Sequence, residues 1–282
     1  MPSVVIAAHN EEAVLGACLR ALQAQQPATP QIVVSANGCT DQTAQIAAGF
    51  GVAVVDLPVA GKARALNAGD DVAEGFPRIY LDADIRVPED AVARILSAFR
   101  PGILAVVPRR RIETTGRSWL VRSYFAINER LPAFRKGLFG RGMIALSADG
   151  RARFTRFPDL VADDLFLDSQ FTDDEKCVAE DVEVTVEAPR TSRDLIRRLV
   201  RVRRGNAQLR AAVARGDLEM PVRPTDRWAW LRDVVVRRPW LVFAAAPYVA
   251  ITVIAALRAR RAPSSAAEWG RDDSTRIAAE EG

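Results

Sequence analysis

The N-terminal part of the chain alternates between short apolar segments and longer stretches with helical character, and no other feature limits the fold as much. The apolar segments lie at 3–8, 31–36, 52–57 and 78–81, and the helical stretches between them lie at 12–25, 42–50 and 61–75. Continuous apolar strands are typical of a parallel sheet whose two faces are covered by helices. The sequence therefore predicts an α/β fold with a Rossmann-like, mostly parallel sheet and helices on both faces.

Polar side chains collect where these apolar segments end. In open α/β sheets, ligands bind at the carboxyl ends of the strands. The residues at such ends are His9, Asn10, Glu11, Asn37, Asp41, Asp82 and Asp84. This coincidence predicts a ligand site at one edge of the sheet.

Asp82 and Asp84 stand one residue apart, directly after the apolar segment 78–81. Two unpaired carboxylates at the end of a buried strand would cost folding free energy, so a cation is expected beside them. Carboxylate oxygens suit Mg²⁺ or Mn²⁺. A pair of aspartates with this spacing is common by chance, and its weight comes from the motifs around it.

Composition narrows the chemistry further. A chain of 282 residues, 49% hydrophobic and 26% charged, is long enough for one large domain with an appendage. A single histidine and three scattered cysteines argue against a zinc site, a disulfide framework and most histidine-based triads, so catalysis must rest on carboxylates. The net charge of +4 permits an anionic partner, but no nucleic-acid recognition motif is present and nucleic acid is not expected.

The ordered set of motifs resembles the family 2 glycosyltransferases, whose GT-A fold binds nucleotide sugars. The resemblance covers roughly residues 3–210. The chain departs from the family pattern at Ala36, where relatives often carry an acidic residue that helps to read the base, and at 198–202, where only Arg201 matches. The motifs are VVIAAHNEE at 4–12, VVSANGCTDQT at 33–43, GKARALNAG at 61–69, YLDAD at 80–84, GRGM at 140–143, ADD at 162–164 and RLVRVRRGN at 198–206.

The resemblance implies a donor site for a nucleotide diphosphate sugar. Asp84 would be the direct metal ligand, and Asp82 would lie nearer the ribose and the outer shell of the metal. The residues expected to meet the nucleoside are Asn10, Glu11 and Asn37, and those expected to meet phosphate are Lys62, Arg201 and Arg203. Arginine is a fork-shaped donor suited to phosphate, although the basic stretch 197–204 is also compatible with a solvated helix or a membrane-surface patch.

An acidic pair further along the chain offers the general base. In relatives this place is taken by Glu-Asp with the second residue as base, so the resemblance implies that Asp164 accepts the proton and that Asp163 orients it. One base and one displacement imply inversion at the anomeric carbon. The alternative is an ordinary helix N-terminus, where acidic side chains are favoured. The similar triplet at 179–181 has β-type surroundings and is interpreted as part of a strand.

The composition of the chain changes in the segment after residue 222, which contains a long uncharged apolar stretch. Residues 240–257 carry no charge, and 18 residues at the helical rise of ~1.5 Å give about 27 Å, close to the thickness of a bilayer core. We therefore expect a GT-A domain at 1–222, a membrane-associated segment at 223–261 and a mobile tail at 262–282. Arginines flank both ends, so their distribution does not orient the segment, and a kinked, re-entrant or surface-lying hairpin and a buried core helix remain open.

These observations predict an inverting, metal-dependent glycosyltransferase at the cell membrane, with its catalytic domain facing the cytoplasm, where nucleotide sugars are made. The acceptor would be a hydroxyl of a lipid, a saccharide or a small molecule in cell-envelope, lipid or polysaccharide glycosylation. A sugar-nucleotide-forming nucleotidyltransferase is the first alternative, but it requires a basic, glycine-rich loop after the first strand, where this chain has AAHNEEAV. A catalytically silent membrane scaffold is the second.

Overall fold

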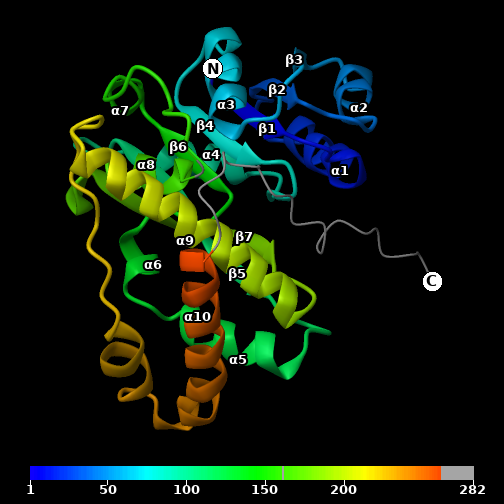
Figure 1. The fold of residues 1–282 in the computed structure, drawn as a ribbon. Coiled ribbons are helices and arrows are strands. Elements are labelled where there is room, and N and C mark those ends of the chain that lie inside the picture. The colour runs from blue at the N-terminus through cyan, green and yellow to red at the C-terminus, as the bar shows by residue number, and fades with distance from the viewer. Residues whose placement is uncertain (161, 262–282) are drawn as a thin grey trace.

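A computed structural model describes residues 1–160 and 162–261 of the chain. Its centre is a seven-stranded sheet with the strand order β3-β2-β1-β4-β6-β5-β7 (Figure 1). The strands are β1 (Ser3–Ala8), β2 (Gln31–Asn37), β3 (Ala53–Leu57), β4 (Arg78–Asp82), β5 (Ala105–Glu113), β6 (Met143–Leu146) and β7 (Lys176–Glu187). The segment 262–282, which the sequence predicts to be a mobile tail, lies outside the described residues.

The first half of the sheet is parallel, as the sequence predicts. β1 pairs in parallel with both β2 and β4, and β2 pairs in parallel with β3. β6 then runs antiparallel to β4 and to β5, while β7 returns parallel to β5. The sheet is therefore mostly parallel with one reversed strand, and the triplet 179–181 lies inside β7, as expected.

Helices cover both faces of the sheet. Alternate residues of β1 point to opposite sides: Val4 and Ile6 pack with α1, α2 and α4, whereas Val5 and Ala7 pack with α3, α8 and α9. The helices are α1 (Glu12–Gln23), α2 (Thr43–Gly49), α3 (Lys62–Val72), α4 (Ala91–Ser97), α5 (Trp119–Asn128), α6 (Ala133–Lys136), α7 (Ala148–Arg151), α8 (Asp163–Asp168), α9 (Ser192–Ala214) and α10 (Val242–Arg261), with short turns η1 (Asp173–Glu175), η2 (Trp230–Val235) and η3 (Pro239–Leu241). The predicted α/β class with two helical layers is confirmed.

A third hydrophobic cluster lies away from the sheet and joins α5, α9, η2 and α10. α10 contacts both α5 and α9, and Figure 1 shows it, in orange, beside them at one end of the molecule. Tyr124 of α5 stacks on Tyr248 of α10 with ring centroids 5.2 Å apart. The helix that contains α10, Pro239–Arg261, is long and apolar enough to cross a membrane by length and composition, and 22% of its most apolar window is buried. One side of α10 thus packs on the protein.

Asp70 is the centre of a buried charge network that fixes α3 against the sheet. Its carboxylate accepts hydrogen bonds from Arg78 at 2.9 Å, from Tyr80 at 2.8 Å and from Arg151 at 2.8 Å. The side chains of Asp70 and Arg78 are 4% and 5% exposed, so the two arginines depend on Asp70 for charge compensation. Because Lys62 begins the same helix, this network also positions one end of the site described below.

We predict that Asp70→Asn lowers the free energy of unfolding by about 3–5 kcal/mol, because it leaves buried arginines without their counter-charge. Asp71→Asn is the matched control: its ion pair with Arg156 has both side chains 59% exposed, and its loss should cost less than about 1 kcal/mol. Chemical denaturation of both variants measures the difference. Equal stability of the two variants would contradict the role of Asp70.

Candidate active site

The acidic residues meet in one cavity at the carboxyl ends of the strands. Asp82 is the last residue of β4, and Asp84 follows it with the buried Ala83 between them, so both carboxylates leave the sheet on its ligand-binding edge. The cavity has a volume of about 1210 Å³, and Asp82, Asp84, Asp163 and Asp164 all line it. The sequence predicted these four as site residues from two distant segments, and the fold brings them together.

Lys62 connects the two acidic segments. Its Nζ atom lies 3.0 Å from Oδ1 of Asp82 and 3.0 Å from Oδ2 of Asp163. Burial alone would lower the pKa of Lys62, but the carboxylates of Asp163 and Asp82 outweigh it and raise this pKa above its usual range. Lys62 in turn holds the pKa of Asp82 below its ordinary value. Asp163, predicted to orient Asp164, therefore has Lys62 as its ion-pair partner.

Asp164 stands in the first turn of α8. Its Oδ2 accepts a hydrogen bond from the backbone N–H of Gly140 at 3.1 Å, and its Oδ1 accepts one from Leu165 at 2.8 Å. Burial, with a further contribution from the negative charge of Asp163, raises the pKa of Asp164 to about 6. A carboxylate with this pKa is ionised at neutral pH and is a stronger proton acceptor than an ordinary aspartate.

The loop before β6 links Asp82 to Asp164. Gly140 and Gly142 both have positive φ, at 68° and 69°, a region that favours glycine. The carbonyl of Gly142 accepts a hydrogen bond from the N–H of Asp82 at 2.8 Å, while the N–H of Gly140 is bonded to Asp164. A Cβ atom on Gly142 would lie 2.5 Å from Ile85. The GRGM motif therefore fixes both acidic segments through its backbone.

Arg141 anchors this loop from inside. It is 3% exposed, and its guanidinium donates to the carbonyl oxygens of Gly137 at 3.3 Å, Pro108 at 2.7 Å and Phe134 at 2.5 Å. Burial lowers its pKa to about 10. In the sequence Arg141 appears only within the GRGM motif and has no predicted role, because its partners are backbone atoms of two other segments, β5 and α6 with its C-terminal end.

α9 contributes arginines to the opposite side of the cavity. Arg198 and Arg201 both help to lower the pKa of Asp82, so both side chains lie within its electrostatic reach. Arg203 lines the same cavity but is exposed, and its charge acts on Tyr124 and Tyr248. Arg201 and Arg203 were predicted from the sequence as phosphate-binding residues, whereas Arg198 was not. The spacing of three residues between 198 and 201 was the signal that both share one helical face.

The residues expected to meet the nucleoside lie at the neighbouring ends of β1 and β2 and do not line this cavity. Asn37 is fully buried: its amide donates to Ala8 O at 2.7 Å and accepts from Gly61 N at 2.9 Å. Asn10 has a φ of 54° and accepts from Thr40 N at 2.7 Å. Glu11 is 5% exposed, and its N–H donates to Thr43 Oγ1. These contacts fix the loops at the strand ends.

The donor set around Asp82 and Asp84 fits a hard divalent cation. In residues 1–160 and 162–261 no group of three or more His, Cys, Asp or Glu side chains is arranged to hold a metal ion, and Asp82 and Asp84 are the two carboxylates at this strand end. Mg²⁺ commonly binds through one or two carboxylates with the remaining positions filled by phosphate oxygens and water. The residues present therefore suit a metal that binds together with a diphosphate.

Asp168 is a further residue that the sequence did not indicate. It is 2% exposed and accepts hydrogen bonds from Leu138 N at 3.0 Å, Lys176 Nζ at 3.0 Å and Arg223 Nε at 3.2 Å. It therefore ties the loop before β6 to β7 and to the segment that follows α9.

Solved structures with the same architecture are glycosyltransferases. A mannosyltransferase from Pyrobaculum calidifontis, in complex with GDP-Man and Mn²⁺, has a TM-score of 0.60 at 19% identity over 94% of this chain and 76% of that chain. Glucosyl-3-phosphoglycerate synthase from Mycobacterium tuberculosis, in complex with Mn²⁺, UDP and glucosyl-3-phosphoglycerate, has a TM-score of 0.53 at 20% identity over 80% and 88%. At these identities the likeness shows the GT-A fold.

TarS from S. aureus is also similar. Its 1–349 fragment in complex with UDP has a TM-score of 0.50 at 16% identity over 93% of this chain and 92% of that chain, whereas this chain covers 36% of the longer TarS structure.

A comparison with curated protein sequences gives no significant match. The model of the family described as Glycosyl transferase family 2 matches residues 3–158, which is more than half of the 282 residues. The match includes β1 to β6 and the pair Asp82 and Asp84, whereas α8 and α9 lie beyond it. By this match and by its GT-A fold, the chain belongs to glycosyltransferase family 2, a family of sugar transferases.

Proposed function

We propose that this protein transfers a sugar from a nucleotide diphosphate sugar to an acceptor hydroxyl with inversion at the anomeric carbon. The proposal rests on one observation: one cavity contains carboxylates at the end of β4 and a carboxylate with a raised pKa on α8. Asp82 and Asp84 occupy the strand end where a metal-bound diphosphate is expected, and Asp164, with its pKa raised to about 6, faces the same space.

The donor would bind between the strand ends and α9. Asp84, supported by Asp82, would hold Mg²⁺ or Mn²⁺, which supplies a Lewis acid for the diphosphate oxygens and stabilises the charge of the leaving group. The presence of Mn²⁺ in the P. calidifontis and M. tuberculosis structures supports this assignment. The remaining donor contacts would be Lys62, Arg201 and Arg203 to phosphate, and Asn10, Glu11 and Asn37 would hold the loops at the ends of β1 and β2 that meet the nucleoside.

The acceptor would be activated by Asp164. Its carboxylate takes the proton of the acceptor hydroxyl while the oxygen attacks the anomeric carbon, and the nucleoside diphosphate leaves from the opposite face. This single displacement inverts the anomeric configuration. Asp163, held by Lys62, contributes negative charge that keeps the pKa of Asp164 raised. The N–H of Gly140 fixes the carboxylate of Asp164 in place.

A donor-hydrolysis screen tests the function directly. The protein is incubated with a panel of nucleotide sugars, with and without Mn²⁺, and release of the nucleoside diphosphate is measured. We expect one donor to be hydrolysed in the presence of Mn²⁺. A nucleotidyltransferase would instead consume a nucleoside triphosphate and a sugar phosphate and release pyrophosphate. A silent scaffold would give no reaction with any donor.

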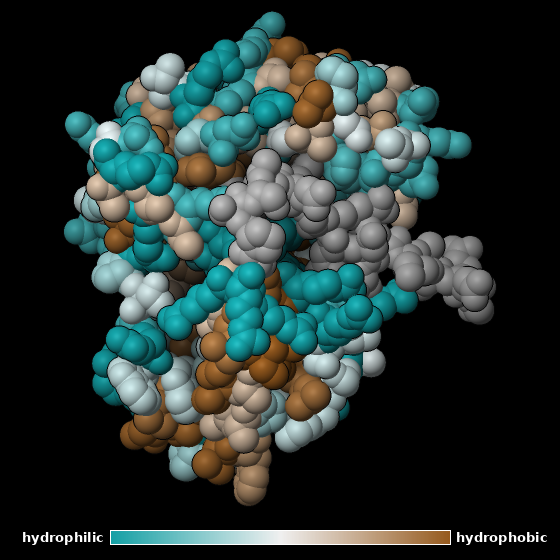
Figure 2. All heavy atoms as spheres, in the orientation of Figure 1, coloured by the Kyte–Doolittle hydropathy of each residue, from teal (hydrophilic) through white to brown (hydrophobic). Residues whose placement is uncertain are grey.

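The protein also presents an apolar surface suited to a membrane. Figure 2 shows apolar surface gathering at the lower end of the molecule, over α10 and the segment that precedes it. Trp240 is 68% exposed and Phe243 is 80% exposed, and arginines flank this region. Aromatic side chains and arginines are favoured at the boundary between lipid and water. The most exposed apolar residues of this end are Trp228, Val236, Trp240, Val242 and Phe243.

We infer that this surface holds the protein on the cytoplasmic side of the cell membrane, where a lipid or envelope saccharide would be the acceptor. Crossing the bilayer would require α10 to separate from α5 and α9 and would expose Tyr248, Ile251 and Ala255. A helix that lies in the interface keeps these contacts and buries only its outer side. The boundaries 1–222 and 223–261 remain our proposal for the catalytic and membrane-associated parts.

We predict that Asp84→Asn weakens the binding of a nucleoside diphosphate in Mn²⁺ by about tenfold or more, because a metal ligand loses its charge. Chelation of the metal should weaken binding of the unaltered protein to a similar extent. Asp71→Asn, an exposed aspartate outside the cavity, is the control. Calorimetric titration measures all three. Full-strength binding in the presence of chelator would refute the metal role.

We predict that Asp164→Asn lowers kcat by about 10²-fold or more while leaving donor affinity nearly unchanged, because it removes the base and preserves the shape. In the unaltered protein, kcat/KM should fall below pH 6, because Asp164, whose pKa is raised to about 6, becomes protonated there and cannot accept the proton. This acidic limb should be absent from Asp164→Asn. Asp181→Asn in β7, outside the cavity, is the control. Near-normal turnover of Asp164→Asn would show that the base lies elsewhere.

We predict that Trp240→Ser combined with Phe243→Ser lowers partitioning onto anionic phospholipid vesicles by at least about tenfold, since two large apolar side chains no longer enter the lipid. Val59→Ser, at a residue that is 56% exposed between β3 and α3, is the control and should partition as the unaltered protein does. Vesicle flotation measures the bound fraction. Unchanged flotation of the double variant would exclude this surface.

A further inference from the structure

The cavity is lined by arginines that the proposed transfer chemistry does not use. Arg110 on β5 lies within electrostatic reach of two like charges, Arg141 in the loop before β6 and Arg198 on α9. Burial, together with the charges of Arg141 and Arg198, lowers the pKa of Arg110 to about 10. Within residues 1–160 and 162–261, neither Arg110 nor Arg198 makes an ion pair with a carboxylate. In the described part of the chain these two guanidinium groups therefore have no carboxylate in direct contact, although Glu129 acts on Arg110 and Arg198 acts on Asp82 at longer range.

Arg110 is held in one orientation. Its guanidinium carbon lies 3.7 Å from the centroid of the Phe134 ring, and Nη1 donates to the carbonyl oxygen of Gly140 at 3.0 Å. Its Nη2 atom is buried and has no hydrogen-bond partner in the described part of the chain. A buried, unsatisfied donor of a charged group is costly unless a ligand completes it. A fixed guanidinium fork matches the oxygens of phosphate or carboxylate.

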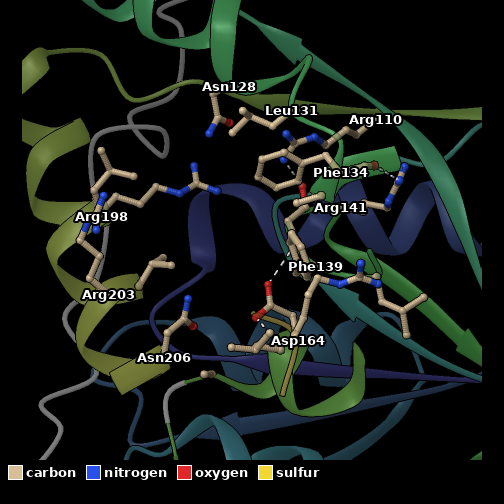
Figure 3. A pocket seen from close by; sticks show the side chains of 18 of the residues that line it. Arg110, Asn128, Leu131, Phe134, Phe139, Arg141, Asp164, Arg198, Arg203 and Asn206 are labelled. Carbon is tan, nitrogen blue, oxygen red and sulfur yellow. Dashed lines mark hydrogen bonds between the residues drawn. The ribbon is translucent and has the colours of Figure 1, made fainter. Parts of the chain in front are cut away.

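The position of Arg110 assigns such an anion to the acceptor. Gly140 contacts both Arg110 and Asp164: its carbonyl oxygen accepts a hydrogen bond from Arg110, and its N–H donates one to Asp164. An anion on Arg110 would therefore lie next to the base. Figure 3 shows Arg110 and Phe134 on one side of the cavity, Arg198 on the other side and Asp164 below.

The cavity continues from these arginines toward the apolar helices. Tyr124 of α5 and Tyr248 of α10, which are 5% and 7% exposed, also line it, as do Val249 and Val253 of α10. The outer side of α10 forms part of the apolar surface described above. A molecule with an anionic head at Arg110 would thus have an apolar path toward the membrane-facing end of the protein.

Building on the proposed sugar transfer, we propose that Arg110 and Arg198 form a second anion subsite, separate from the donor diphosphate, which binds a phosphate group of the acceptor close to its accepting hydroxyl. The apolar part of this acceptor lies along α5 and α10. The acceptor is therefore an amphiphilic phosphate ester. A soluble phosphate ester and a membrane lipid share the same head-group chemistry, and the length of the apolar chain distinguishes them.

The test is calorimetric titration of the full chain with dodecyl phosphate, both alone and after saturation with a nucleoside diphosphate and Mn²⁺. We expect dodecyl phosphate to bind under both conditions, because its subsite is separate from that of the nucleotide. Arg110→Met and Arg198→Met should each weaken this binding by about tenfold or more, the loss of one charged hydrogen-bonded contact. Arg193→Met, an exposed arginine of α9 outside the cavity, should bind as the unaltered protein does.

Further titrations separate the alternatives. Dodecyl maltoside has the same chain with a neutral head, and its binding should be the same in all variants. Equal affinity for glycerol 3-phosphate and dodecyl phosphate would overturn the apolar part and assign a soluble phosphate ester. Unchanged dodecyl phosphate binding in both Arg110→Met and Arg198→Met would overturn the subsite. If Arg110→Met does not fold, as judged by circular dichroism, Arg198→Met decides.

Nucleotide binding distinguishes failure of this subsite from failure of the proposed function. Arg110→Met should bind the nucleoside diphosphate with Mn²⁺ as tightly as the unaltered protein. Weaker nucleotide binding in Arg198→Met, with dodecyl phosphate binding retained, would assign Arg198 to the donor and overturn the proposal. An unaltered protein that binds no nucleotide would refute the donor site, while the titration with dodecyl phosphate alone would still decide the anion subsite.

Discussion

The paired contact of Lys62 with Asp82 and Asp163 is the interaction on which the arrangement of the active site depends. The two carboxylates come from β4 and α8, on segments far apart in the chain, and they would repel each other at this separation without a cation between them. Lys62 begins α3, and the buried Asp70 network near the other end of that helix holds it against the sheet. The charge balance of the site is therefore built into the packing of one helix.

The glycine-rich loop before β6 imposes a second constraint, in backbone geometry. Gly140 and Gly142 take positive φ, and their peptide groups hold Asp164 and Asp82 by hydrogen bonds. Arg141 between them is buried and satisfied by three backbone carbonyls, so the loop is fixed from both sides. Because the carbonyl of Gly140 also accepts from Arg110, one short loop sets the relative positions of Asp82, Asp164 and Arg110.

The distribution of charge and apolar surface gives the cavity two different ends. Carboxylates gather at the strand ends, where the donor and its metal are proposed to bind, and arginines with aromatic rings gather toward α5 and α10. Most of the exposed large apolar residues lie at that second end. A protein arranged in this way can take a water-soluble donor from one side and an amphiphilic acceptor from the other, which fits attachment at a membrane surface.

The sequence by itself determined the α/β class, the parallel order of the first strands and the acidic pair at 82–84, because these follow from local apolar runs and from polar residues at strand ends. The pair at 163–164 was indicated only by the resemblance to the family. The sequence also indicated correctly that 179–181 belongs to a strand. Only the tertiary structure decided the reversed direction of β6, the pairing of Lys62 with Asp163 and the roles of Arg141, Asp168 and Arg110. Their partners lie on other segments of the chain or are backbone atoms, and no local pattern of residue types records either.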